Sequence, residues 1–380
     1  MFEVKKGEIP IKIWTEEVEK GALEQAVNLS NLPFAFRHIS LMPDVHQGYG
    51  MPIGGILATK EKMIIPNAVG VDIGCGVTVL RTNINHIAPE RIKSILQKLK
   101  EIIPVGFNHH KKPVNWSGFK DIPQSKLFRD ELKSAKHQLC TLGGGNHFCS
   151  IEKGGDGNIW LMVHSGSRNL GFKVARYFNN VAKKINSKER IVPKEYDLAP
   201  LSLNTPEGEE YLEAMKYCLK FAKTNREMLL TQFFKIVSQA TEARDIEIFD
   251  CHHNFASQEK HFDEEVIVHR KGAIKLDIGE KGIIPGSMGT PSFIVEGLGN
   301  PESFNSCSHG AGRIMSRKEA NKIISKEKAD KSMEGIIFDG WKEDYSEAPM
   351  AYKNIEKVMR YQSDLVNTII KLNPLGVMKG

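Results

Sequence analysis

Apolar residues recur at helical spacing in four stretches of the chain. A first helix is predicted to start at Thr15 and to end within residues 28–33, because its apolar residues lie three or four positions apart. The same spacing predicts a helix over about residues 89–100. A long helix is predicted over about residues 209–244, where nothing breaks the periodicity, and a last helix over about residues 351–372.

Short apolar runs bounded by turn residues predict strands between these helices. The runs lie at residues 63–65, 77–81, 159–163, 246–250 and 264–273. The run IWLMV at 159–163 is apolar on both faces, which is typical of a buried strand. Histidine, serine and arginine follow it directly, at the end of the strand where mixed sheets often carry ligand-binding groups.

A glycine-rich segment, residues 41–59, surrounds Asp44 and His46. We expect a loop beside apolar strands, because glycine permits tight turns and close approach of the backbone to a ligand. A plain surface turn explains the same composition equally well, so this segment alone leaves both interpretations open.

The order of these elements predicts the fold class. We find no internal repeat, no low-complexity tract and no linker between two domains. The sequence therefore predicts one α+β domain over residues 1–380. Mixed or antiparallel sheets would surround a central metal and nucleotide site, with inserted helices that include a long helical insertion at about 205–245.

Composition adds limits to this picture. The chain has 380 residues, a net charge of +6 and 41% hydrophobic residues, which is ordinary for a globular protein and compatible with a polyanionic partner. The six cysteines are widely spaced without a CxxC pair, so we expect reduced thiols and a cytoplasmic location. No apolar leader and no run long enough to span a membrane is found, and we expect no membrane partner.

One short motif, VDIGCGV at residues 71–77, places a carboxylate and a thiol three residues apart, at Asp72 and Cys75. In isolation, a capped turn and a small buried cysteine would explain it. Four histidines downstream favour a metal site over this structural explanation, because each lies in a glycine- or asparagine-rich turn. They are His147, His164, His253 and His309. Imidazoles, a carboxylate and a thiolate form a plausible two-metal site, and a thiolate can bridge two ions. Ligand softness alone would favour zinc, and the residues leave the choice between His252 and His253 open.

Further segments carry groups suited to phosphates and nucleic acid. PGSMGTPS at 285–292 offers unshielded backbone N–H groups and hydroxyls, without the pattern of a P-loop. His309 has small neighbours, and a neutral imidazole can attack an α-phosphate. The stretch 107–120 interleaves basic residues with Phe107, Trp116 and Phe119, which suits either nucleic-acid binding or a solvated loop anchored by its aromatic rings.

Together, these segments resemble the RtcB-type RNA-splicing ligase family. The matching stretches occur in order from about residue 41 to the end of the chain. They are DVHQGYGMPIGG, GVDIGCGV, LGGGNHF, HSGSRNLG, HHNFA, VHRKGA, PGSMGTPS, SHGAGRIMSR, AYK at 351–353 and the terminal GVMKG. No single stretch is diagnostic, but their combination and order are highly specific.

The resemblance implies a role for each matching residue. The manganese ligands would be Asp72, Cys75, His147, His164 and His253, with the cysteine bridging two ions. His309 matches the histidine that becomes covalently guanylylated. The guanylate-binding positions would be Asn146, Ser287, Ser292, Ala311, Gly312, Tyr352 and Lys379, and the segment Pro285, Gly286, Ser287, Met288 and Gly289 would wrap the nucleotide. From charge and position we also expect Arg168, Arg270 and Arg313 to hold phosphates.

The implied activity is that of a GTP-dependent RNA ligase with two Mn²⁺ ions. It would join an RNA 3′-phosphate or 2′,3′-cyclic phosphate to a 5′-hydroxyl through a GMP-histidine intermediate, in tRNA splicing or RNA repair. The partner would be RNA with such cleaved ends, and the need for an archease-like activator stays open. Family members usually carry a glutamate at the position of Ser150, and here a glutamate, Glu152, follows two residues later, which leaves guanine selectivity open.

Two other classes of function compete with the ligase. A metal-dependent phosphodiesterase or phosphatase would keep the metal site without sealing RNA, and its hydrolysis would survive His309→Ala. A non-catalytic RNA-binding relative would bind RNA without a covalent GMP. Such a relative would not need the five metal-ligand positions and the histidine nucleophile, all of which are present in this sequence.

Overall fold

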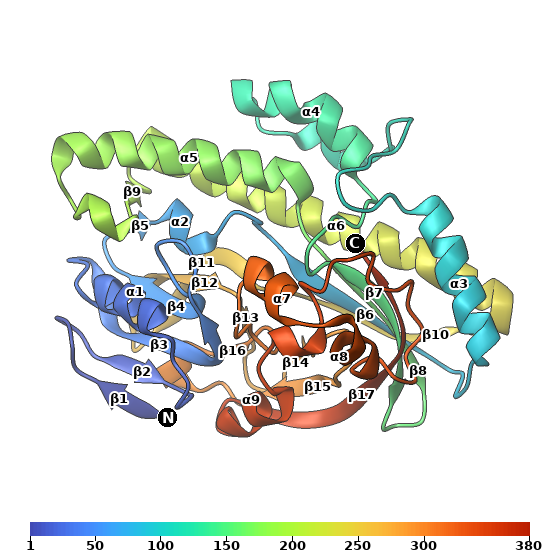
Figure 1. Ribbon diagram of the computed structural model, residues 1–380. Coiled ribbons are helices and arrows are strands. Elements are labelled where there is room, and N and C mark those ends of the chain that lie inside the picture. Colours follow the sequence, from blue (N-terminus) through green and yellow to red (C-terminus); the bar gives the residue numbers. More distant parts are fainter.

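A computed structural model describes residues 1–380 and shows an α+β domain built on two main sheets. Figure 1 shows the sheets side by side, with α5 and α6 lying across the top of both. The α+β class and the single domain that the sequence predicts are confirmed. No helix is long and apolar enough to cross a membrane.

The first sheet has six strands in the order β1-β2-β3-β4-β12-β11. Its β2 and β3 run parallel, and all other neighbours are antiparallel. The strands are β1 (Phe2–Val4), β2 (Ile11–Ile13), β3 (Ala35–His46), β4 (Ile53–Thr59), β11 (Asn254–His261) and β12 (Glu264–Lys271).

The second sheet has seven antiparallel strands in the order β10-β6-β8-β7-β17-β15-β14. They are β6 (Gly76–Thr82), β7 (Phe148–Gly154), β8 (Ile159–Ser165), β10 (Asp245–His252), β14 (Lys281–Ile284), β15 (Ser292–Gly297) and β17 (Val366–Lys379). Two small ladders pair β5 (Met63–Ile64) with β9 (Leu201–Ser202) and β13 (Ala273–Lys275) with β16 (Ser306–Ser308).

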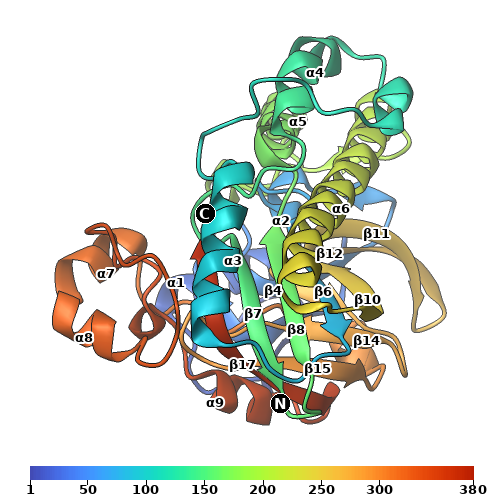
Figure 2. The same cartoon turned by 90° about the vertical axis from the view of Figure 1, so that its right-hand side faces the viewer.

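Nine α-helices surround the sheets. They are α1 (Lys20–Ser30), α2 (Pro66–Val69), α3 (Pro89–Ile102), α4 (Lys126–Gln138), α5 (Arg168–Glu189), α6 (Pro206–Thr241), α7 (Arg317–Ile323), α8 (Lys326–Lys331) and α9 (Ile355–Tyr361). In Figure 2, α7 and α8 project to one side of the sheets. A small core of their own holds them together, built around Met333 and Trp341.

The long helix α6 connects two of the larger cores. Its N-terminal half, from Tyr211 to Phe221, packs with α4 and α5 in one cluster of buried residues. Its C-terminal half, from Leu229 to Val237, packs with α3, β7 and β8 in another. Apolar residues line successive sides of this helix because it is covered along most of its length.

The structure corrects three predictions. The last helix is wrong: α9 is short, and residues 366–379 form strand β17 between β7 and β15. Pairing on both edges supplies long-range hydrogen bonds that local helical spacing does not reveal. The glycine-rich segment 41–59 is mostly the hairpin of β3 and β4, and it forms a loop only at residues 47–52. The first helix begins at Lys20 rather than Thr15.

Candidate active site

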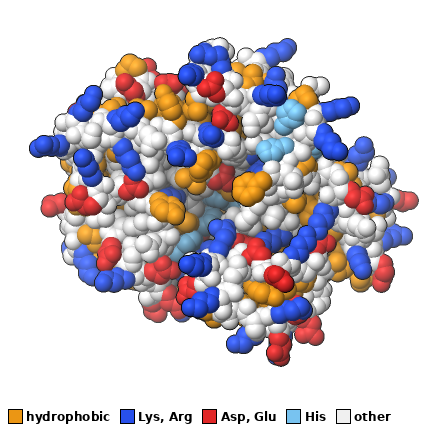
Figure 3. Space-filling model, turned by 45° about the horizontal axis from the view of Figure 1, so that its top comes forward, with side chains coloured by type: hydrophobic (Ala, Val, Ile, Leu, Met, Phe, Trp, Pro, Cys, Tyr) orange, Lys and Arg blue, Asp and Glu red, His pale blue; other side chains and the backbone are white.

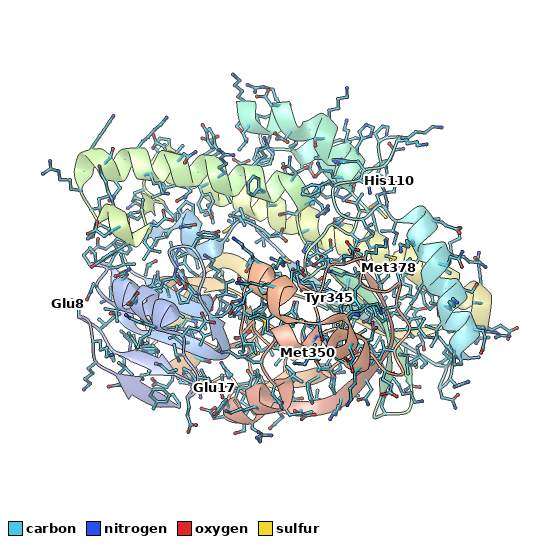
Figure 4. The ribbon with its side chains drawn as sticks, viewed as in Figure 1. Glu8, Glu17, His110, Tyr345, Met350 and Met378 are labelled. Carbon is cyan, nitrogen blue, oxygen red and sulfur yellow. The ribbon has the colours of Figure 1, made fainter.

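A cavity of about 390 Å³ opens where the two main sheets meet the C-terminal segments. Figure 3 shows it as a hollow with histidine side chains at its base. Tyr345 and Met350, labelled in Figure 4, belong to the segment that brings Glu347 and Tyr352 to its wall. The lining residues are His46, Ile53, Val71, Asp72, Gly145, Asn146, His147, Phe148, His164, Pro285, Gly286, Ser287, Met288, His309, Gly310, Ala311, Gly312, Arg313, Arg317, Glu347, Tyr352 and Lys379.

Strand register brings the candidate metal ligands together. In the ladder of β6 and β8, Val77 lies opposite His164, so Cys75, just before β6, lies beside that histidine. On the other edge of β6, the backbone N–H of His253 donates to the carbonyl of Cys75 at 2.9 Å. The start of one strand and the ends of its two neighbours thus gather at one point.

Cys75 is the centre of this cluster. Its Sγ lies 3.4 Å from Nε2 of His147 and 3.3 Å from Nε2 of His164. Asp72 adds a carboxylate oxygen, Oδ2, 3.1 Å from Nε2 of His147. The Asp72 carboxylate fits because residue 166 is glycine: a Cβ there would lie 2.2 Å from Oδ1 of Asp72.

Hydrogen bonds on the far side of the rings fix their orientation. Nδ1 of His147 donates to the carbonyl of Leu142 at 2.9 Å, and Nδ1 of His164 donates to that of Asn146 at 3.0 Å. Because a carbonyl oxygen only accepts, each ring carries its proton on Nδ1 and presents a bare Nε2 to Cys75. Outer hydrogen bonds of this kind are typical of metal-binding histidines, so the residues present fit a metal ion.

Protonation agrees with a metal-binding role. Burial is the main reason why the pKa values of His164 and His253 lie well below the ordinary value, so both rings are neutral, as ligands must be. Burial and then the charge of Asp72 raise the pKa of the Cys75 thiol well above its ordinary value. A thiolate at this point therefore requires the positive charge of a cation beside it.

Ring positions separate the two neighbouring histidines. The ring centre of His253 lies 5.3 Å from that of His164 and 4.7 Å from that of His309. The ring of His252 instead packs against Phe255, with centres 4.4 Å apart. The geometry therefore brings His253, and not His252, to the cluster.

His309 is held by an acidic residue from the opposite sheet. Oδ2 of Asp44 accepts hydrogen bonds from Nδ1 of His309 at 2.6 Å and from its backbone N–H at 3.1 Å. Burial alone would raise the pKa of Asp44, but the charge and hydrogen bond of His309 outweigh it, and this pKa lies below its ordinary value. The imidazole thus keeps a proton on Nδ1, which leaves Nε2 unprotonated.

The backbone around Asp44 and His309 is closely packed. Nζ of the buried Lys353 donates to the carbonyls of Pro43 and Val45, at 3.0 and 2.6 Å, on both sides of Asp44. Gly312 has a φ of +74°, and a Cβ there would lie 2.2 Å from the carbonyl oxygen of Asp44. A glycine at 312 therefore lets the loop that carries His309 lie directly on β3.

Most of the predicted nucleotide-binding residues reach the cavity. Its walls include Asn146, Pro285, Gly286, Ser287, Met288, Ala311, Gly312, Tyr352 and Lys379. Gly289 and Ser292 are not among the lining residues. Ser292 lies one layer behind the wall, where its Oγ accepts from the backbone N–H of Gly286 at 3.3 Å.

A charged network forms one wall of the cavity. Oε1 of the buried Glu347 accepts from Nη1 of Arg313 at 3.2 Å and from Nε of Arg317 at 2.8 Å. The hydroxyl of Tyr352 donates to the other oxygen of Glu347. Burial and the neighbouring Glu347 raise the pKa of Tyr352, so its hydroxyl stays protonated.

Ser150 and Glu152 lie on one face of β7, two residues apart. Oγ of Ser150 donates to Oε1 of Glu152 at 2.8 Å, and Ser292 contacts the same oxygen at 3.4 Å. Burial raises the pKa of Glu152 to about 7. Glu152 thus lies behind the cavity wall at Gly286 and is connected to it through Ser292.

The three arginines that the sequence suggested for phosphates differ in position. Arg270 is completely buried, paired with Glu259 and bonded to the carbonyl of Phe304 at 2.7 Å, so this prediction is wrong for Arg270. A cation committed to a buried pair in this way is part of the core. Arg313 lines the cavity. Arg168 is bonded to the carbonyl of Gly106 at 2.9 Å.

A second buried arginine, Arg226, holds the backbone beside two candidate metal ligands. Arg226, in the middle of α6, donates from Nη1 to the carbonyls of Gly74 at 2.7 Å and Ser165 at 3.0 Å, which are neighbours of Cys75 and His164. Its Nε and Nη2 bind Asp250 at 2.6 and 2.8 Å. One side chain therefore fixes the backbone next to two of the candidate ligands.

Sequence reasoning missed three residues that line the cavity, and also Asp44, which is buried against His309. Asp44 and His46 were noticed in their glycine-rich segment but received no role, and Arg317 and Glu347 were not singled out. Glu347 lies five residues before Tyr352 of the AYK stretch, and Arg317 ends the SHGAGRIMSR stretch. Attention to the charged residues at the edges of these motifs would have found both.

Comparison with known proteins agrees with the motifs. The family described as tRNA-splicing ligase RtcB matches residues 25–127 and 117–380. The RNA-splicing ligase RtcB of Escherichia coli K12 is 39% identical over 98% of this chain and 97% of its own length. The tRNA-splicing ligase RtcB of Thermococcus kodakarensis is 30% identical over 99% of this chain and 96% of its own length.

Proposed function

This chain belongs to the RtcB family of RNA-splicing ligases, and from that premise we propose that it joins RNA ends by way of a guanylylated histidine. The ends would be a 3′-phosphate or 2′,3′-cyclic phosphate and a 5′-hydroxyl, the nucleotide GTP and the metal Mn²⁺, as two ions. The role would be tRNA splicing or RNA repair.

One observation carries the proposal: His309 faces the cavity with its Nδ1 bound by Asp44 and its ring beside the metal cluster. A histidine with that tautomer presents Nε2 to an incoming phosphate. A hydrolase that only activates water at its metals would have no use for such a nucleophile. The phosphodiesterase alternative is therefore less well supported.

The candidate metal ligands are Asp72, Cys75, His147, His164 and His253, and their donor set and outer hydrogen bonds fit divalent cations. Bound ions would act as Lewis acids that stabilise charge on the transferring phosphate. Thiolate and imidazole alone would also suit zinc, so the proposal of manganese rests on the family.

The first chemical step uses His309 and Asp44. Nε2 of His309 would attack the α-phosphorus of GTP, forming the N–P bond as the bond to the β-phosphate oxygen breaks and pyrophosphate leaves. The carboxylate of Asp44 would stabilise the positive charge that develops on the ring while Nδ1 keeps its proton. The backbone of residues 285–289 and the side chains of Asn146, Tyr352 and Lys379 would hold the guanylate.

The remaining steps pass the activated phosphate to RNA. An oxygen of the RNA 3′-phosphate would attack the same phosphorus and break its bond to Nε2. The RNA 5′-hydroxyl would then attack the activated 3′-phosphate, lose its proton and release GMP. Arg313 and Arg317 line the cavity and are suited to hold the phosphates between these steps.

Two further proposals concern the setting of the reaction. We place the protein in the cytoplasm, because all six cysteines are free and buried, which suits a reducing compartment. An archease-like activator is a candidate partner by family membership alone.

The decisive experiment is intact mass spectrometry after incubation with GTP and Mn²⁺, beside the variant His309→Ala. We expect a gain of one GMP in the wild type only, and lability of the adduct in acid. An adduct with ATP in place of GTP would mean that Ser150 has changed the base preference. Metal-dependent cleavage of RNA that survives in His309→Ala, with no adduct to any nucleotide, would instead establish the phosphodiesterase.

A further inference from the structure

Two aromatic side chains stand in solvent on loops that adjoin segments lining the cavity. Phe107 is 100% exposed and Tyr49 is 79% exposed, more than any other aromatic residue of the chain. The other two rings of the segment 107–120 behave differently, since Trp116 and Phe119 pack against Tyr217 and Phe221 of α6. This segment is therefore anchored by two aromatic rings and presents the third to water.

Hydrogen bonds fix the backbone around Phe107 to the segment that precedes His147. Phe107 lies within a turn closed by the hydrogen bond from Asn108 N–H to the carbonyl of Val105, at 3.1 Å. The preceding residue, Gly106, donates to the carbonyl of Gly143 at 2.7 Å. Gly143 is packed against His147, because a Cβ on it would lie 2.5 Å from Nδ1 of that ring. The backbone next to the exposed ring is thus linked, through Gly106 and Gly143, to the surroundings of His147, a candidate metal ligand.

Tyr49 occupies the corresponding position at the other main sheet. It lies in the loop between β3 and β4, flanked by His46 and Ile53, which both line the cavity. Its carbonyl accepts a hydrogen bond from Nζ of the buried Lys271 at 2.6 Å. Figure 1 shows β3 and β4 to the left of β6 and β7, and Figure 4 labels His110, three residues after Phe107, at the upper right.

The charge around Phe107 is positive. Residues 105–120 contain Lys111, Lys112 and Lys120 and no aspartate or glutamate. At the cavity itself, Arg317 has a side chain that is 54% exposed. Figure 3 shows hydrophobic side chains and Lys or Arg side chains around the hollow. Flat apolar rings among cations fit a polyanion with flat faces of its own, which is single-stranded nucleic acid.

We propose that Phe107 and Tyr49 are base-stacking surfaces, one on each side of the cavity, for the terminal nucleotides of the two RNA strands that are joined. The inference rests on the proposed RNA substrate and names how its ends are held. Stacking accepts any base, so it suits an enzyme that must position ends of varied sequence. Because hydrogen bonds fix the backbone of both residues, little conformational entropy is lost when a base binds.

The test compares Phe107→Ala with Phe107→Trp in binding a single-stranded RNA decamer that ends in a 3′-phosphate. Fluorescence anisotropy gives Kd over a series of salt concentrations. Loss of one stacked base should weaken binding about tenfold or more in the alanine variant, and tryptophan should restore it. Since the ring carries no charge, the slope of log Kd against log salt should not change, whereas Lys112→Ala should reduce it.

Ile278→Ala is the matched control, because Ile278 is also a highly exposed apolar residue (81%), and its turn lies against Gly297 and Gly299, which are not cavity residues. It should bind RNA like the wild type. Tyr49→Ala should weaken binding of a decamer with a 5′-hydroxyl end in the same way. If Tyr49 instead stacks on the strand with the 3′-phosphate, Tyr49→Ala should weaken binding of the first decamer.

Formation of the GMP adduct, measured in the same preparations, separates this inference from the proposed function. An adduct together with unchanged RNA affinity in both Phe107→Ala and Tyr49→Ala would overturn the stacking role and leave the ligase standing. A wild-type protein that binds RNA through Phe107 but forms no adduct would overturn the ligase proposal and leave the stacking role standing.

Discussion

The Asp44 carboxylate lies 2.6 Å from Nδ1 of His309, although the two residues are 265 positions apart in the chain. One belongs to β3 and the other follows β16, so the pair forms only when the first sheet and the C-terminal half of the chain have come together. This contact sets which nitrogen of the histidine is free to react.

Replacing Asp44 by asparagine should therefore slow guanylylation by about 100-fold or more, because the charge that stabilises the imidazolium is lost while the shape is kept. The rate of GMP incorporation is measured by intact mass at fixed GTP and Mn²⁺. Metal content, measured on the same sample, should not change, since Asp44 does not contact the cluster. An unchanged rate would show that the pair is not part of the chemistry.

Replacing Cys75 by alanine should remove bound metal and the GMP adduct while the fold survives. Its Sγ lies 3.4 Å from Nε2 of His147 and 3.3 Å from Nε2 of His164, so its loss opens the centre of the cluster. Metal per chain is counted by elemental analysis, and circular dichroism checks the fold. Cys218→Ala is the matched control, because Cys218 is an equally buried thiol in α6. Equal metal content in the two variants would exclude Cys75 as a ligand.

Replacing Lys379 by alanine should weaken guanylylation more than metal binding. Lys379 lines the cavity and pairs with Asp344 at 3.2 Å, and a charge-assisted contact to a nucleotide would make a difference of about tenfold or more in rate at low GTP. Lys371→Ala on the same strand is the control, since Lys371 pairs with Glu356 at the surface. If both variants label at the same rate, β17 does not bring its terminal lysine to the nucleotide.

Replacing Glu152 by glutamine should change how stability depends on pH. Burial raises the pKa of Glu152 from 4.5 to about 7, so the folded protein keeps a proton that the unfolded chain releases in this range. This contribution is fully present below pH 4.5 and is lost as pH rises through 7, by about 3 kcal/mol at most.

The glutamine variant lacks this titration and should gain stability relative to wild type between pH 5 and about pH 8. Urea unfolding at four pH values in that range gives the difference in free energy directly. A constant difference between the two proteins across the range would mean that Glu152 is already ionised when folded.

Local patterns predicted the strands at 77–81 and 159–163 and the histidine that ends the second of them. These features depend on neighbours in sequence, and β6 and β8 confirm them. The motifs likewise indicated where ligands gather, because each contains its own turn. The structure then brings Asp72, His147 and His164 to the wall of one cavity, with Cys75 in contact with both histidines.

The same reasoning could not predict contacts between segments that are distant in the sequence. Nothing near Asp44 in sequence shows that its partner is His309, and nothing near Arg270 shows that Glu259 neutralises it in the core. The error over the last helix has the same origin, because residues 366–379 become a strand through their pairing with β7 and β15. The β-branched residues at 366 and 368–370 were the one local sign of a strand.

The position of Arg226 determines which elements unfold together in a local unfolding event. Its helix, α6, is 36 residues long, or about 54 Å, and the arginine in its middle is bonded to the backbone beside Cys75 and His164. Local unfolding of the central turns would break these bonds and release β6 and β8 together. The amides of these three elements should therefore exchange with solvent deuterium as a single cooperative unit, and slow exchange in the helix would report directly on an intact catalytic centre.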